Sequence, residues 1–162
     1  LHMVMMKGKS LPRLYGHFIG RSTKPVLTVT SHPTADQQTV WYMGGDLAEN
    51  GVEKTEAEQI DITRQLLKKL LPGLSLDSSL VFATHRISRA EPAQATLTRP
   101  DDAFISSSNN IISGWPTKLA LAPRFAAKVL EEMRLKPGHR PPSTTPLALQ
   151  HPPVASFPWH NL

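Results

Sequence analysis

The stretch of residues 110–119 carries the side chains and backbone best suited to chemistry. It reads Asn-Ile-Ile-Ser-Gly-Trp-Pro-Thr-Lys-Leu and continues into an apolar helical pattern. It therefore predicts a short strand, a glycine turn at Gly114 and the start of a helix. Such a junction directs free backbone amides and the positive end of a helix dipole toward one point. That arrangement suits a ligand group that becomes anionic.

Two arginines form a second candidate site. Arg86 and Arg89 fall in residues 80–89, where apolar and polar side chains alternate as in a strand. The planar guanidinium can hold a carboxylate or phosphate by two parallel hydrogen bonds. Because a regular strand has a period of two, both arginines share a site only across a bulge, and Arg86 is preferred. The alternative is an exposed arginine or an ion pair with Glu91 or Asp101.

Tyr42 is the third candidate, because its phenol can donate a hydrogen bond to a substrate. It follows Trp41 in a predicted strand over residues 39–43, so the two rings lie on opposite faces. Packing in a sheet is the alternative interpretation of both aromatics. Weaker candidates are the histidines His17, His32 and His85.

Composition excludes several classes of site. The 162 residues include no cysteine, which removes disulfides and thiolate chemistry and fits a reducing, cytoplasmic compartment. No phosphate-binding glycine loop, nucleophile elbow or short-spaced histidine pair occurs, so no metal site is predicted. The net charge of +5 is scattered, which indicates solubility rather than nucleic-acid binding. No apolar run is long enough for an integral membrane segment.

The elements that must position these residues begin with four strand patterns separated by turn formers, at residues 2–7, 16–20, 26–31 and 39–43. A helix follows, with Thr55 as its cap, Glu58 completing a capping box, and Pro72-Gly73 at its end. Its predicted apolar stripe consists of Ile60, Leu67, Leu70 and Leu71.

The second half predicts a hairpin from residues 95–98 and 103–106, and a strand over residues 110–113. A second helix should start within residues 119–122, because Pro123 is harmless only in a first turn. Beyond residue 134 the chain is rich in proline and lacks periodicity. We therefore expect an α+β fold of one domain over residues 1–134, with a mostly antiparallel sheet and two main helices, and a disordered tail over residues 135–162.

On these residues, from position 1 to about position 133, the sequence resembles FAD-dependent oxidoreductases of the D-amino-acid oxidase and glycerol-3-phosphate dehydrogenase type. The resemblance implies that the turn after the last strand faces the flavin of a flavoprotein. It also implies that Arg86 anchors the substrate, and that Tyr42 and Arg89 belong to the same substrate site. The implied flavin contacts are Gly114, Trp115, Pro116, Thr117, Lys118 and Leu119.

The resemblance covers only the substrate domain, since the amino-terminal Rossmann unit of such a fold has no counterpart in these residues. It implies that the parent protein oxidises a CH-OH or CH-NH group of a small molecule by hydride transfer to FAD. We expect this chain to be inactive alone, to bind FAD weakly without the missing half, and to self-associate through uncovered apolar surface. The alternative is a non-enzymatic interaction module whose proline-rich tail binds partners.

Overall fold

A computed structural model describes residues 1–21, 24–88, 92, 101–109, 111–133, 150, 153–160 and 162. The chain divides into two compact units. We call residues 1–89 with 153–162 the sheet unit, and residues 90–152 the hairpin unit. Each unit is described by itself.

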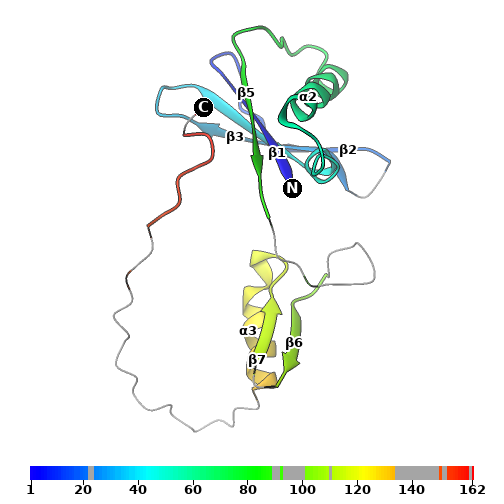
Figure 1. The fold of residues 1–162 in the computed structure, drawn as a ribbon, viewed down its shortest axis with the longest axis vertical. Coiled ribbons are helices and arrows are strands. Elements are labelled where there is room, and N and C mark those ends of the chain that lie inside the picture. The colour runs from blue at the N-terminus through cyan, green and yellow to red at the C-terminus, as the bar shows by residue number, and fades with distance from the viewer. Residues whose placement is uncertain are drawn as a thin grey trace. The chain divides into compact units, whose positions relative to one another are not determined.

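The sheet unit is built on five antiparallel strands (Figure 1). Their spatial order is β2-β3-β4-β1-β5, so the first strand lies inside the sheet and β5 forms one edge. The predicted α+β class with a mostly antiparallel sheet is confirmed. The strands are β1 His2–Gly8, β2 Gly16–Ile19, β3 Pro25–Pro33, β4 Thr39–Gly44 and β5 Val81–Arg86.

Strand alternation separates the sheet into two faces. Met6 pairs with Trp41 and with Phe82, and these three residues lie on the face that the helices cover. Helices α1 (Asp46–Glu49) and α2 (Glu56–Leu70) pack there, and Figure 1 shows α2 beside β1 and β5. We call it the helix face. Its buried core consists of Val4, Met6, Leu27, Val29, Trp41, Met43, Leu47 and Leu67, with Leu11 and Leu80 at its margin.

Helix α2 begins as the sequence predicts, with Thr55 and Glu58 exchanging both bonds of a capping box. Its buried side differs from the predicted stripe, because polar Gln59 and Thr63 are buried beside Leu67. The Gln59 side-chain amide donates to the carbonyls of His2 and Leu47, each at 2.9 Å. A buried amide that ties a strand to two helices satisfies backbone groups that an apolar side chain would leave unpaired.

The second sheet face carries Met5, Val40 and Tyr42, and we call it the Tyr42 face. No described helix packs on it. It is met instead by Trp159, whose indole is 8% exposed. Trp159 and Leu162 thus pack against this face of the sheet, and both lie within residues 135–162, for which the sequence predicts a disordered tail. The described residues contain no helix of the length and apolarity that a membrane crossing requires.

The hairpin unit consists of β6 (Phe104–Ser108), β7 (Ile111–Trp115), a 3-10 turn at Leu119–Leu121, and α3 (Ala122–Glu132). β6 pairs with β7, and α3 packs on both (Figure 1). The predicted hairpin partner at residues 95–98 lies outside the described residues. Helix α3 starts within the range that the sequence predicts, with Pro123 in its first turn.

Candidate functional site

Tyr42 lies on the Tyr42 face among aromatic and imidazole rings. Its ring centroid is 5.7 Å from that of Trp159 and 6.5 Å from that of His85. The sheet positions this group, because Tyr42 and Ala83 both pair with Met5 and the next residue on the same face of β5 is His85. Burial raises the pKa of the Tyr42 phenol. The phenol is therefore protonated near neutral pH and acts as a hydrogen-bond donor.

Residues 153–162 complete this face of the sheet. Trp159 stacks on His32 with ring centroids 4.1 Å apart, and Phe157 stacks on Trp159 at 5.0 Å. Lys7 donates from Nζ to the carbonyl oxygen of Leu162 at 2.6 Å. Sequence reasoning missed these residues because proline content dominated the stretch. The aromatic pair Phe157 and Trp159 was the signal that could have indicated a docked segment.

His32 joins this group from β3. Its Nε2 lies 2.9 Å from the Thr30 hydroxyl, and partial burial lowers the pKa of its imidazole. The neutral imidazole is therefore favoured, and its flat face packs against the Trp159 indole. The Tyr42 face thus offers a neutral phenol, a neutral imidazole and stacked apolar rings, which suits an organic group with few charges.

Arg86 lies on the other side of the sheet. It pairs with His2 on the helix face, whereas Tyr42 lies on the Tyr42 face. Its guanidinium donates to the carbonyls of Val52 and Lys54, both at 2.5 Å, so its fork is occupied by backbone acceptors. The structure therefore does not bring Arg86 and Tyr42 together. Arg89 lies outside the described residues.

Gly114 is the fourth residue of β7 and packs directly under α3. A side chain there would overlap the Phe125 ring, and the Phe104 carbonyl oxygen would be 3.2 Å from its Cβ. Trp115 faces Phe104 with ring centroids 5.8 Å apart. These two predicted flavin contacts thus have packing partners inside the hairpin unit.

The remaining predicted flavin contacts form the turn before α3. Thr117 has a φ of 58°, in the left-handed region, and its hydroxyl donates to the Pro116 carbonyl at 2.7 Å. Lys118 lies 3.8 Å from the Asp101 carboxylate, and Leu119 is 91% exposed. Helix α3 follows with Leu121 at its cap, where no side chain accepts from the first amides. The Ala122 amide donates to the Leu119 carbonyl and Pro123 has no amide hydrogen, so this turn presents the positive end of the helix dipole rather than a row of free amides.

Asp102, just before β6, ties the start of that strand to α3. Its carboxylate accepts from Arg124 Nε at 2.6 Å and from the Ala103 amide at 2.7 Å, and it lies 2.9 Å from Lys128 Nζ. Hydrogen bonds from Arg124 and Lys128 keep the pKa of this carboxyl far below its usual range. Asp102 is therefore a fixed anion that anchors the helix, not a candidate proton carrier.

The architecture defines an antiparallel sheet layered with helices, together with a strand-turn-helix unit. No family model matches the chain. A curated relative from Pseudomonas aeruginosa, described as a probable FAD-dependent oxidoreductase, is 49% identical over 161 residues, which is 98% of this chain. This chain spans 41% of the length of that relative.

A solved structure gives the same result for the fold. The crystal structure of an FAD-dependent oxidoreductase from Pseudomonas aeruginosa matches with a TM-score of 0.78 and 49% identity, over 96% of this chain and 43% of that one. At this identity, the shared fold extends to the order and spacing of the elements. The relative is thus a longer protein, and this chain corresponds to part of it.

Proposed function

We propose that this chain is the substrate-side part of an FAD-dependent oxidoreductase and acts together with a dinucleotide-binding segment. The observation that carries the proposal is 49% identity along 98% of the chain to a probable FAD-dependent oxidoreductase. Both units are included in that match. The reaction we propose is oxidation of a CH-OH or CH-NH group of a small molecule, in which the carbon gives up a hydride and the heteroatom a proton.

The turn from Gly114 to Leu119 is the proposed flavin-facing segment. Its chemistry fits an acceptor that gains negative charge, because the positive end of the α3 dipole follows the turn and Lys118, which lies 3.8 Å from the Asp101 carboxylate, adds a cation to it. Bound FAD would supply the hydride acceptor. Gly114 contributes by letting Phe125 approach β7, which fixes where α3 begins.

Tyr42 is the proposed substrate contact, as a neutral hydrogen-bond donor on the Tyr42 face. His85 and Trp159 lie beside it and would shield the reacting carbon from water. Arg86 is assigned to bracing the connection at Val52 and Lys54, because its guanidinium donates to both carbonyls. The resemblance prefers Arg86 as the substrate anchor, and because its guanidinium is bound to backbone carbonyls, Arg89 becomes the proposed anchor for an anionic substrate group.

A chimera tests this proposal with a direct optical readout. The segment of the Pseudomonas aeruginosa relative that aligns with this chain is replaced by this chain, and the purified protein is examined for flavin absorbance and for reduction by candidate hydroxy and amino compounds. We expect a yellow protein whose flavin is bleached by a substrate. The unmodified relative, purified in parallel, is the control for flavin loading.

A folded, colourless chimera would overturn the proposal. Circular dichroism and gel filtration establish whether the chimera is folded, so a missing flavin is not confused with a missing structure. Tyr42→Phe in the chimera is the matched variant for the substrate contact. It should keep the flavin absorbance and raise KM, because it removes one hydroxyl and preserves the ring contacts.

A further inference from the structure

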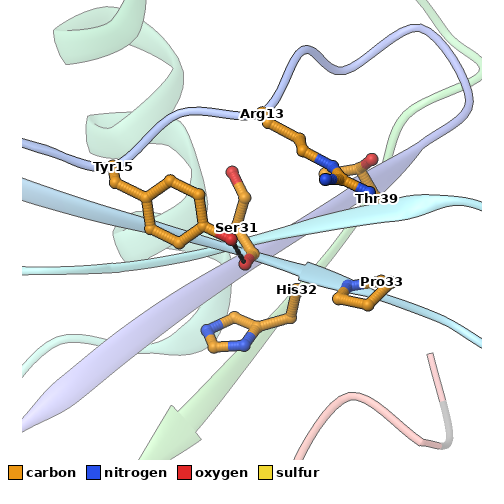
Figure 2. Close-up of a pocket in the computed structure, with 6 residues that line it drawn as sticks. All are labelled: Arg13, Tyr15, Ser31, His32, Pro33 and Thr39. Carbon is orange, nitrogen blue, oxygen red and sulfur yellow. Dashed lines mark hydrogen bonds between the residues drawn. The ribbon is translucent and has the colours of Figure 1, made fainter.

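A cavity opens at the edge of the sheet unit and shares one lining residue, His32, with the group of rings on the Tyr42 face. It lies between the connection that joins β1 to β2 and the ends of β3 and β4, and its volume is about 260 Å³. Figure 2 shows the side chains around it. The cavity is lined by Arg13, Tyr15, Ser31, His32, Pro33 and Thr39.

The connection is held to the sheet by three hydrogen bonds to and from Ser31, which is buried in β3. The Ser31 hydroxyl accepts from the Leu14 amide at 2.7 Å and donates to the Leu14 carbonyl at 2.8 Å. The Tyr15 hydroxyl donates to the Ser31 carbonyl at 2.7 Å, as the dashed line in Figure 2 marks. Ser31 is 3% exposed, so these bonds are largely protected from competing water.

A second anchor lies on the other side of Arg13. Trp41, buried in the sheet, donates from its indole nitrogen to the carbonyl of Pro12 at 2.8 Å. The backbone is therefore fixed both before and after Arg13. Among the described residues, nothing accepts a hydrogen bond from the Arg13 guanidinium or pairs with it.

The side chains in the cavity lining that can carry charge near neutral pH are both basic. Arg13 is a permanent cation, His32 is titratable, and no carboxylate lines the cavity. The remaining lining combines the rings of Tyr15 and Pro33 with the Thr39 hydroxyl. A guanidinium on an anchored backbone segment beside flat rings matches a ligand with an anionic group on a flat or apolar body.

We propose that this cavity binds a small organic anion. The carboxylate or phosphate of the ligand is held by Arg13 in two-point contact, and its body packs between the Tyr15 ring and His32. The volume lies just below the range of about 300 to 1,000 Å³ that is common for ligand pockets, which limits the body to about one ring. The cavity shares His32 with the Tyr42 face, but its lining contains neither Tyr42 nor any residue of the turn from Gly114 to Leu119, so a change at Arg13 tests the anion site without altering the proposed flavin and substrate contacts.

The test is a titration of the full chain with four probes, followed by the NMR signals of the Tyr15 and His32 rings. Benzoate and phenyl phosphate carry a ring on the anionic group, whereas acetate and inorganic phosphate present the anionic group alone. We expect one of the two ring-bearing probes to shift both residues in a saturable manner and to bind more tightly than its small counterpart. The better of the two identifies the head group.

Matched variants localise the contact. Arg13→Gln should weaken the better probe about tenfold or more, because a charge-assisted pair is removed, while Lys9→Gln should change its affinity by less than about twofold. Lys9 is an exposed cation in the same connection that does not line the cavity, so it controls for net charge. Equal losses in the two variants, or no saturable shift with any probe, would overturn the proposal.

Discussion

Gly114 illustrates how one missing side chain controls a whole unit. A methyl group at this position would collide with the Phe125 ring, and Phe104 would prevent the backbone from moving away. We expect Gly114→Ala to destabilise the hairpin unit by about 1–3 kcal/mol, as overpacking in a filled site does. Hydrogen exchange of the β6 and β7 amides measures the change.

Two further variants separate this clash from a general effect of alanine. Gly73→Ala introduces the same methyl group where nothing lies within 4 Å, so it should leave stability unchanged. Adding Phe125→Leu to Gly114→Ala should restore part of the loss, because the smaller side chain makes room. A double variant whose loss equals the sum of the two single losses would contradict the packing explanation.

The Asp36 carboxylate is held by the side chains of Lys7, Thr34 and Gln38. It accepts from Thr34 at 2.5 Å and from Gln38 at 2.8 Å, and it lies 3.0 Å from Lys7 Nζ. The Thr34 and Lys7 bonds lower the pKa of Asp36 from 3.8 to about 2. The charged form is therefore favoured by folding, and the stability it contributes is complete above about pH 4 and lost as the pH falls through 2.

An NMR titration of the Asp36 carboxyl carbon checks this value directly. Asp36→Asn should remove the part of the acid-dependent stability that Asp36 contributes, while Asp61→Asn, on exposed helix surface, controls for the loss of one charge. A midpoint for Asp36 near the ordinary value of 3.8 would show that the Lys7 and Thr34 contacts do not persist in solution.

The residue types that could do chemistry were visible in the sequence, but their grouping was not. Alternation within each strand correctly placed Arg86 and Phe82 on the same face of β5. The register between β1 and its neighbours decides that Tyr42 lies on the opposite face from Arg86, and register depends on long-range pairing that no local pattern encodes.

At the scale of elements, residues 153–162 behave as an added layer of the sheet unit. Trp159 contacts Met5 and Val40 and stacks on His32, so its removal uncovers the Tyr42 face. We expect Trp159→Ala to release this segment, because truncating a buried tryptophan costs about 3–5 kcal/mol. The release should appear as faster proteolysis within residues 153–160 and as a shift of the His32 ring signals in NMR spectra.

Phe157→Ala is the matched control for that experiment. Phe157 stacks on the outer side of Trp159 and is more than half exposed, so its loss should change the proteolysis rate much less. Equal proteolysis of the two variants and the unmodified chain would contradict the docked arrangement.

Short sequence motifs predicted both ends of one helix correctly. Helix α2 followed from its capping box and from Pro72-Gly73, because both ends are encoded within a few residues. Helix α1 was missed, since its four residues make about one turn, too few for an apolar pattern to repeat, and they follow Gly45, whose φ is 82°. The sequence also predicts an apolar stripe on the second helix, and two of its members, Leu130 and Met133, are exposed in the hairpin unit. The full predicted stripe is Ala122, Phe125, Ala126, Val129, Leu130 and Met133.

At the scale of the whole molecule, the uncovered apolar surface of the hairpin unit predicts self-association. Leu119 is 91% exposed and Ile111 is 67% exposed, and Leu130 and Met133 add apolar surface on α3. Clusters of exposed apolar residues of this kind are typical of association surfaces. We expect the purified chain to form dimers or larger species at micromolar concentrations, measured by sedimentation velocity.

A double variant of the hairpin unit and a control variant of the sheet unit decide whether the hairpin unit is responsible for self-association. Leu119→Ser with Ile111→Thr should shift the chain toward monomer, whereas Val154→Ser, which alters a 97% exposed residue of the sheet unit, should not. The net charge of +5 opposes association, so added salt should strengthen it by screening that repulsion. A chain that sediments as a monomer at every salt concentration would show that this apolar surface is tolerated in water, and that a dinucleotide-binding partner is not needed to cover it.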